Sequence, residues 1–162
     1  MSGGSSRFER WLAIAADVAT ALGIVVGIIV LLATREQLKD ARKTAESMTV
    51  YSIQKDARDM ITALRQKKAV FDFITDYNPT NNYPVALRQE ADFEIGQLVQ
   101  FHSAVFNQHR NGVITDRYWS TFEQNIRNFM SFAPVSAYWT NNVLKGGYNE
   151  EFKQFGRRIF QR

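Results

Sequence analysis

The sequence predicts an all-α protein, with an N-terminal transmembrane helix that continues into a long helix and is followed by a cytoplasmic helical bundle. Three observations predict this class: an apolar run over residues 11–33, helical spacing of apolar residues beyond it, and no alternating strand pattern of convincing length. The 162 residues are 45% hydrophobic and 22% charged, close to globular averages, which argues against disorder. We expect a short tail at 1–10, the transmembrane helix at 11–33, a juxtamembrane helix at 34–77 and a helical domain at 85–162.

The apolar run WLAIAADVATALGIVVGIIVLLA, residues 11–33, contains a single charged residue, Asp17. About 20 mostly apolar residues cross the hydrocarbon core of a bilayer as an α-helix. A cleaved signal peptide would have a shorter apolar stretch and a small-residue cleavage site, whereas this run continues into charged, helix-forming sequence. A membrane anchor is therefore favoured, and a buried soluble helix is the alternative.

The basic residues beside this run predict its orientation. Arg7 and Arg10 precede it, while a larger basic group follows it, made up of Arg35, Lys39, Arg42 and Lys43. The positive-inside rule then places residues 34–162 in the cytoplasm and the short tail outside, as in a bacterial inner-membrane protein.

Small residues recur every fourth position within the predicted span, at Ala15, Ala19, Gly23 and Gly27. Such a line lets two helix backbones approach closely, so it indicates a helix–helix contact. The alternative is that alanine and glycine are simply frequent in membrane helices.

Asp17 lies away from this line, on a helix face that it shares with Ala13 and Ile24. An acidic side chain within a membrane helix suggests an aqueous path or a polar partner, so these three residues are candidate pore-lining positions. Alternatively, Asp17 lies close enough to the interface to be hydrated locally.

Residues 34–77 contain no proline or glycine, and their apolar residues keep a nearly helical spacing with one slip near 51–53. We expect a single long helix, bent if anywhere at that slip. Its first turns carry Arg35, Lys39, Arg42 and Lys43 among acidic residues. These four side chains either contact anionic lipid headgroups or belong to a solvated helix face with ion pairs one turn apart.

The remaining helices are separated by turn-forming residues. The loop NPTNNYP at 78–84 precedes a helix over 85–109, which Asn111-Gly112 closes. A second helix begins near Thr115, a short one follows Pro134 and ends at Gly146-Gly147, and the last starts near residue 149.

The chemistry-bearing residues do not form a recognisable catalytic motif. With no cysteine and only His102 and His109 as histidines, we expect no metal, no cofactor and no enzymatic activity. A net charge of +4 is too small to indicate a dedicated nucleic-acid binder. The basic C-terminus fits a solvated helix end better than an RNA site, and its charges are Lys153, Arg157, Arg158 and Arg162.

The order of these features resembles a family of small bacterial membrane-anchored proteins that has no assigned activity. The resemblance rests on REQLK at 35–39, FEIG at 93–96, YW at 118–119 and YNEEF at 148–152. The chain is also similar in build to the membrane accessory proteins of type VI-B CRISPR systems, which implies a link to pore formation and antiphage defence. The arginine–histidine motif of helical ribonuclease domains is missing, which argues against an RNA-directed role.

Two functions fit the sequence. The first is a non-enzymatic scaffold or accessory protein, anchored in the lipid bilayer, that self-associates or docks on a larger membrane complex. The second is an oligomeric channel or pore-forming effector lined by Asp17, Ala13 and Ile24. The number of copies in the assembly distinguishes them, because a pore needs a closed ring of several protomers.

Overall fold

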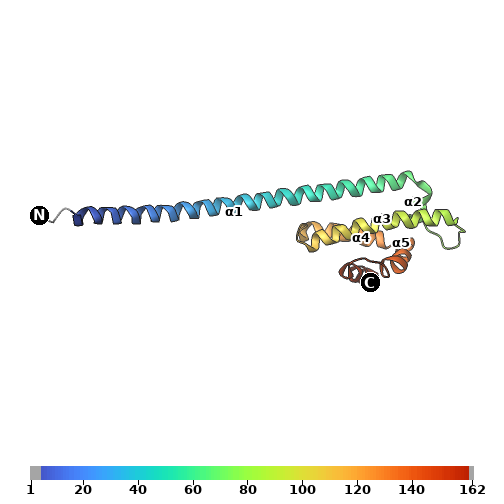
Figure 1. Cartoon of the computed structure of the whole chain (residues 1–162). Coiled ribbons are helices and arrows are strands. Elements are labelled where there is room, and N and C mark those ends of the chain that lie inside the picture. The colour runs from blue at the N-terminus through green and yellow to red at the C-terminus, as the bar shows by residue number, and fades with distance from the viewer. Residues whose placement is uncertain (1–4, 161–162) are drawn as a thin grey trace. The chain divides into compact units, whose positions relative to one another are not determined.

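The structure is a computed structural model that describes residues 5–160, with the side chains of residues 11, 20 and 22–160. The described chain is helical and contains no strand, which confirms the all-α prediction (Figure 1). The chain divides into two compact units, residues 1–45 and residues 46–162. The elements are α1 (Ser5–Gln66), α2 (Lys68–Thr75), α3 (Val85–Arg110), α4 (Asp116–Met130), α5 (Ala133–Tyr138), the π-helix η1 (Trp139–Val143) and α6 (Glu150–Phe160).

The segment predicted to span a membrane is helical along its backbone, as part of α1. In the described part of the chain, no helix combines the length and the apolar character that a membrane crossing requires. The side chains of residues 12–19 and 21, which belong to the predicted span, lie outside the described residues.

The helix predicted over 34–77 is wrong in its extent, because α1 ends at Gln66 and a separate helix, α2, begins at Lys68. Lys67 interrupts the helix, with φ −88° and ψ 65°. Its N–H donates a hydrogen bond to the carbonyl of Leu64, three residues earlier, at 3.0 Å. The Lys67 ammonium group contacts Glu90 at 3.1 Å and Glu94 at 2.7 Å, both on α3. The side chain at this corner thus contacts α3, and local sequence does not reveal these contacts.

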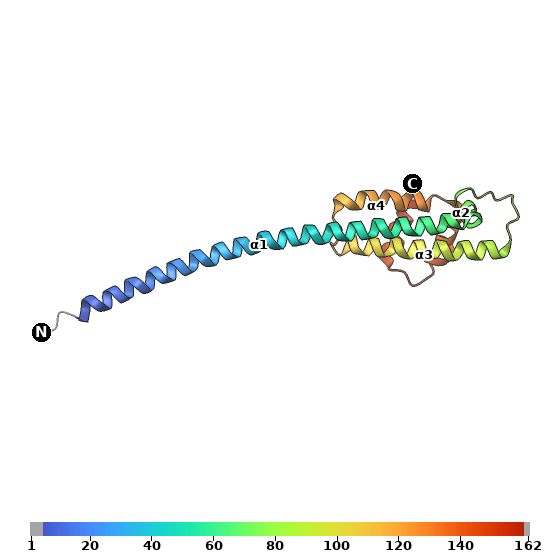
Figure 2. The ribbon, with the colours of Figure 1, turned by 90° about the horizontal axis from the view of Figure 1, so that it is seen from above.

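The later part of α1 runs along the bundle (Figure 2). It packs there through one line of side chains. Its members alternate at intervals of three and four residues and are buried or half-buried: Glu46, Val50, Ile53, Ala57, Met60 and Leu64. A second line with the same spacing is exposed: Leu38, Ala41, Ala45, Met48 and Ser52. The slip predicted near 51–53 therefore corresponds to two lines on different faces of α1, and no bend is needed to explain it.

The core of the 46–162 unit is rich in aromatic side chains. Trp139 and Phe152 are fully buried, with ring centroids 5.1 Å apart, and Phe152 also contacts Phe106 at 5.5 Å. The Trp139 ring lies so close to Gly156 that a Cβ atom added there would be 1.9 Å from a ring carbon. The π-turn over 139–143, closed by the Leu144 N–H donating to the carbonyl of Trp139 at 3.1 Å, positions this ring against α6.

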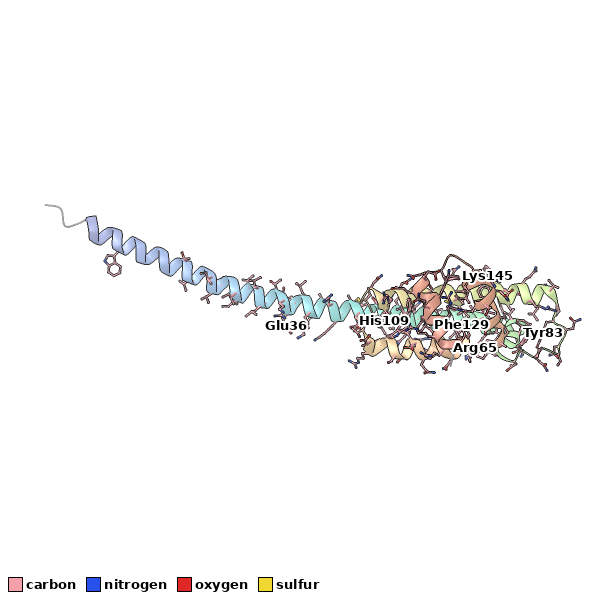
Figure 3. All side chains as sticks on the ribbon, turned by 90° about the horizontal axis from the view of Figure 1, so that it is seen from below. Glu36, Arg65, Tyr83, His109, Phe129 and Lys145 are labelled. Carbon is pink, nitrogen blue, oxygen red and sulfur yellow. The ribbon has the colours of Figure 1, made fainter. Side chains whose placement is uncertain are left out.

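The loop between α2 and α3 is ordered around Tyr83, at the end of the bundle away from His109 (Figure 3). The Tyr83 hydroxyl accepts a hydrogen bond from the Asn78 N–H at 3.0 Å, and its ring meets Phe73 edge-on at 4.8 Å. The Asn78 side chain accepts from the Thr80 N–H at 3.0 Å, which forms a local turn. The predicted loop is confirmed, and aromatic contacts hold it on the bundle.

Stability should fall at mildly acidic pH because of His102, whose ring contacts Phe101 and Phe129. Burial lowers the pKa of His102 from 6.5 to about 4. Between these values the unfolded chain binds the proton and the folded chain does not, so the free energy of unfolding decreases as pH falls through this window. We expect a loss of about 2 kcal/mol between pH 7 and pH 5 from this group.

Urea unfolding of the native chain and of His102→Phe at the two pH values measures this contribution. The substitution keeps an aromatic ring and removes the titrating group, so the stability loss should be smaller by about 2 kcal/mol. An identical loss in both proteins would assign the pH dependence to other groups.

Candidate functional site

The most prominent surface feature is a continuous apolar stretch on the early part of α1. From Leu22 to Leu32 every large hydrophobic side chain is between 52% and 70% exposed, on all sides of the helix. A helix that is hydrophobic all round is normally buried in a large core or in lipid. Because these side chains are exposed, the stretch is a candidate surface for contact with lipid or with another helix.

The structure describes the surroundings of two of the four small residues that were predicted to form a helix–helix contact. Gly23 and Gly27 are exposed, and a Cβ atom at either position would meet nothing within 4 Å. The side chains of Ala15 and Ala19 lie outside the described residues. The helix contact predicted for these four residues stays a prediction, with its described half open to a partner.

Of the three predicted pore-lining residues, the structure describes the side chain of one. Ile24 is 59% exposed, whereas the side chains of Ala13 and Asp17 lie outside the described residues. The aqueous path that these three residues were predicted to line therefore stays a prediction.

The four basic residues after the apolar stretch differ in their contacts among the described residues: the two lysines form ion pairs and the two arginines do not. Lys39 contacts Glu36 at 3.4 Å and Lys43 contacts Asp40 at 3.6 Å, each across one helical turn. Within the described chain, Arg35 and Arg42 have no ion-pair partner, and both are exposed. The two lysine pairs are those of a solvated helix face, and the headgroup contact proposed for the four basic residues stays a prediction.

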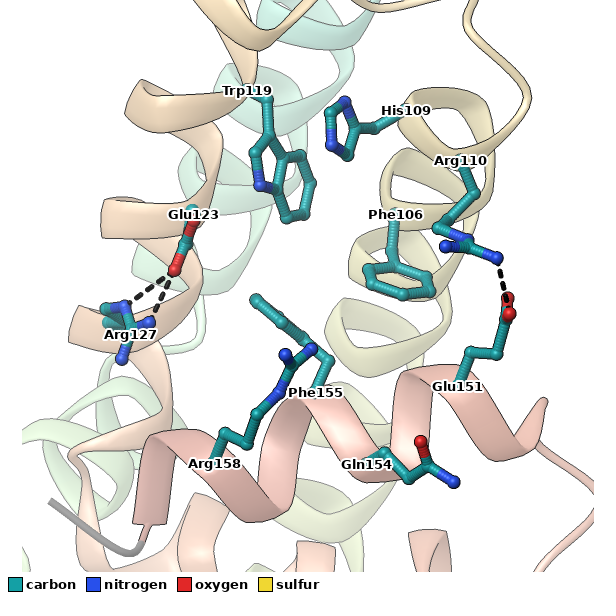
Figure 4. Close-up of a pocket in the computed structure, with 10 residues that line it drawn as sticks. All are labelled: Phe106, His109, Arg110, Trp119, Glu123, Arg127, Glu151, Gln154, Phe155 and Arg158. Carbon is teal, nitrogen blue, oxygen red and sulfur yellow. Dashed lines mark hydrogen bonds and ion pairs between the residues drawn. The ribbon is translucent and has the colours of Figure 1, made fainter.

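A second candidate site is a groove of about 680 Å³ between α3, α4 and α6 (Figure 4). Each helix presents one face to it, because its contributing residues lie three or four positions apart. The lining residues are Phe106, His109 and Arg110 from α3, Trp119, Glu123 and Arg127 from α4, and Glu151, Gln154, Phe155 and Arg158 from α6.

Two of the three arginines in the groove are paired with glutamates. Arg110 forms an ion pair with Glu151, which connects α3 to α6. Arg127 forms one with Glu123 on its own helix, and the Arg127 Nε donates to the same carboxylate at 3.1 Å. Arg158 has no ion-pair partner among the described residues, and its side chain extends into the groove beside Phe155 (Figure 4).

His109 has a structural role at one end of the groove. Its ring stacks on Trp119 with centroids 4.4 Å apart and planes 3° apart. Its Nδ1 lies 3.1 Å from the carbonyl oxygen of Ile114, to which it donates, and its Nε2 is 3.7 Å from the carboxylate of Asp116. These contacts hold the turn between α3 and α4, as expected for a packing histidine.

The predicted C-terminal basic patch is divided by the fold. Lys153 is buried and contacts Glu150 at 2.9 Å, Arg158 lines the groove, and Arg157 is exposed outside it. Arg162 lies outside the described residues. The grouping of Arg158 with Arg110 and Arg127 was missed, because these arginines are far apart in sequence and meet only through the packing of three helices.

The groove is lined by charged side chains and by three largely buried aromatic side chains, Phe106, Trp119 and Phe155. Its lining contains no serine, threonine, cysteine or lysine that could act as a nucleophile. Within the described residues there is also no cluster of three or more potential metal ligands. Arg158, which has no ion-pair partner among the described residues, is available to bind an anionic group.

Comparison of the chain with family models, with curated proteins and with solved structures finds no match. The resemblance drawn from short motifs is therefore still a prediction, and the function has to be argued from the surfaces described above.

Proposed function

We propose that this protein is a non-enzymatic membrane-anchored accessory or scaffold protein, in which the apolar part of α1 holds the helical domain at a bilayer surface. The observation that carries this proposal is the exposed apolar stretch between Leu22 and Leu32. This stretch belongs to the longer run over residues 11–33, whose length suits a bilayer core.

The cost of leaving this stretch in water supports a lipid environment. Covering a large aliphatic side chain contributes about 1.5–3 kcal/mol when burial is complete, and these side chains are more than half exposed. Between residues 22 and 32, covering them would contribute roughly 10 kcal/mol in total. Lipid can cover all sides of the helix at once, whereas one partner helix covers a single face.

The charges that follow the apolar stretch support the proposed orientation. Arg35 lies two residues after the run, and Arg42 lies two turns further along the same face of the helix. Open guanidinium groups at this position suit the anionic headgroups of the cytoplasmic leaflet, where each basic residue contributes about 1 kcal/mol. The helical domain would then lie on the cytoplasmic side.

Association with further copies or with a larger complex completes the proposed role. An anchored helical domain would position partners at the bilayer, and Gly23 and Gly27 leave room for a neighbouring helix. The channel alternative depends on Asp17, so an effect of Asp17→Asn on ion conductance in planar bilayers would favour it over the scaffold.

The proposal is tested by fractionating cells that produce the chain with a reporter fused after Arg162. The fusion should stay with the membrane pellet after an alkaline carbonate wash, and a reporter that functions only in the cytoplasm should be active. A chain released by carbonate would overturn the anchor. A pelleted chain with an exported C-terminus would keep the anchor and overturn the orientation and the headgroup contacts.

A further inference from the structure

The early part of α1 carries an uncovered line of side chains with the spacing of a coiled coil. Its members are separated alternately by three and four residues, and all are exposed: Ile24, Gly27, Leu31, Thr34, Leu38, Ala41 and Ala45. We call these seven residues the seam. This 3.5-residue repeat keeps a helix face turned towards a second helix over several heptads.

The seam avoids charge in a region that is otherwise highly charged. Between 34 and 46 the chain carries Arg35, Glu36, Lys39, Asp40, Arg42, Lys43 and Glu46, and none of these residues falls on the seam. A helix face that only met water would not need to exclude charge. The seam is also distinct from the bundle-facing line, whose first member is Glu46.

We propose that the seam binds the same seam of a second copy of this chain, in a parallel and in-register two-helix coiled coil. Written as a heptad, position a holds Ile24, Leu31, Leu38 and Ala45, and position d holds Gly27, Thr34 and Ala41. The small residues at position d allow the helices to approach closely. This proposal rests on the proposed function, since it specifies how the anchored chain self-associates.

The flanking positions favour the parallel arrangement. In a parallel pair, position g of one helix faces position e of the next heptad of its partner, so Gln37 would face Arg42 and Val30 would face Arg35. Neither combination places like charges together. In an antiparallel pair the e positions face each other, so Arg35 and Arg42 of the two copies would repel.

A helix contact along the seam differs from a contact along the line of small residues in the residues that it uses and in their spacing. Gly27 belongs to both, whereas Gly23 belongs only to the small-residue line and Leu31 and Leu38 only to the seam. A contact along the small-residue line would follow a four-residue interval and a right-handed crossing. A contact along the seam follows a 3.5-residue interval and continues past the apolar stretch.

Because the chain has no cysteine, single-cysteine variants of the full-length protein test the seam without background. In an in-register parallel pair, a seam position faces its own copy and can form a disulfide, which requires Cα atoms within about 7 Å. We expect disulfide-linked dimers from Leu38→Cys, Ala41→Cys and Ala45→Cys. No disulfide-linked dimer should form in the matched variants Lys39→Cys and Lys43→Cys, because these positions face away from the seam.

A second pair of variants measures association without a cross-link. Leu38→Glu should shift the mass of the protein in detergent from dimer to monomer, and the exposed off-seam control Ser47→Glu should leave the dimer intact. Equal cross-linking at every position, or none at any position, would overturn the seam. Carbonate fractionation of the same variants reports the anchor independently, so membrane retention without seam cross-links would contradict this inference alone.

Discussion

Replacing Gly156 by alanine should destabilise the helical domain even though alanine is the better helix former. In an open helix the substitution would stabilise by about 1 kcal/mol. Here the new Cβ atom would lie 1.9 Å from one ring carbon of Trp139 and 2.5 Å from another. Trp139 is only 1% exposed, so its ring has little room to move away.

Overpacking of this kind costs about 3 kcal/mol or more, which outweighs the gain in helix propensity. We expect a net loss of at least about 2 kcal/mol and a decrease in Tm of roughly 5–15 °C, measured by circular dichroism. Gly147→Ala is the matched control, because an added Cβ atom there meets nothing within 4 Å. A Gly156→Ala protein as stable as the native chain would contradict the packing of η1 against α6.

Two lysines introduced into the apolar stretch should release the chain from membranes. Val25 and Ile29 are more than half exposed and lie on neither the seam nor the small-residue line, so Val25→Lys with Ile29→Lys disturbs lipid contact and leaves helix contacts in place. Lysine near the centre of a membrane helix costs about 2.5–3.5 kcal/mol, so the pair costs about 5 kcal/mol or more.

The large aliphatic residues between 22 and 32 contribute only about −4 kcal/mol to insertion on the same scale, so the double substitution should reverse the balance. We expect most of the variant in the supernatant after membrane sedimentation, while Val25→Leu with Ile29→Leu pellets like the native chain. Full retention of the lysine variant in the pellet would mean that the stretch does not contact the lipid core.

The helices after residue 84 could be predicted because their signals are local. In α3, Ala91, Ile95 and Val105 repeat at helical intervals and are buried, and Asn111-Gly112 ends the helix where Gly112 adopts a φ of 71°. Pro84 precedes α3, Pro134 lies at the start of α5, and Gly146-Gly147 separates η1 from α6. An amphipathic helix carries its own period, so one sequence is enough to place it.

The features that could not be predicted depend on contacts between distant residues. The break at Lys67 has no proline or glycine to announce it, and it is held by Glu90 and Glu94 on another helix. The groove brings Arg110, Arg127 and Arg158 together through the packing of three helices. No periodicity within one segment contains that information.

The two lines on α1 show where a periodic signal is read correctly but assigned wrongly. Both follow alternating intervals of three and four residues, and the sequence alone presented them as one stripe with a slip. Packing distinguishes them, because Val50, Ile53 and Leu64 are buried in the domain while Leu38 and Met48 are exposed. An exposed line with a regular period is a surface that the chain itself leaves uncovered.

Protease protection tests the membrane anchor most directly. The full-length protein is reconstituted into sealed lipid vesicles and digested with a protease of broad specificity, and the surviving peptides are weighed by mass spectrometry. The account predicts one protected peptide that covers residues 11–33 and that disappears when detergent dissolves the vesicles. Complete digestion of this segment in intact vesicles would contradict the proposal that α1 anchors the protein in the bilayer.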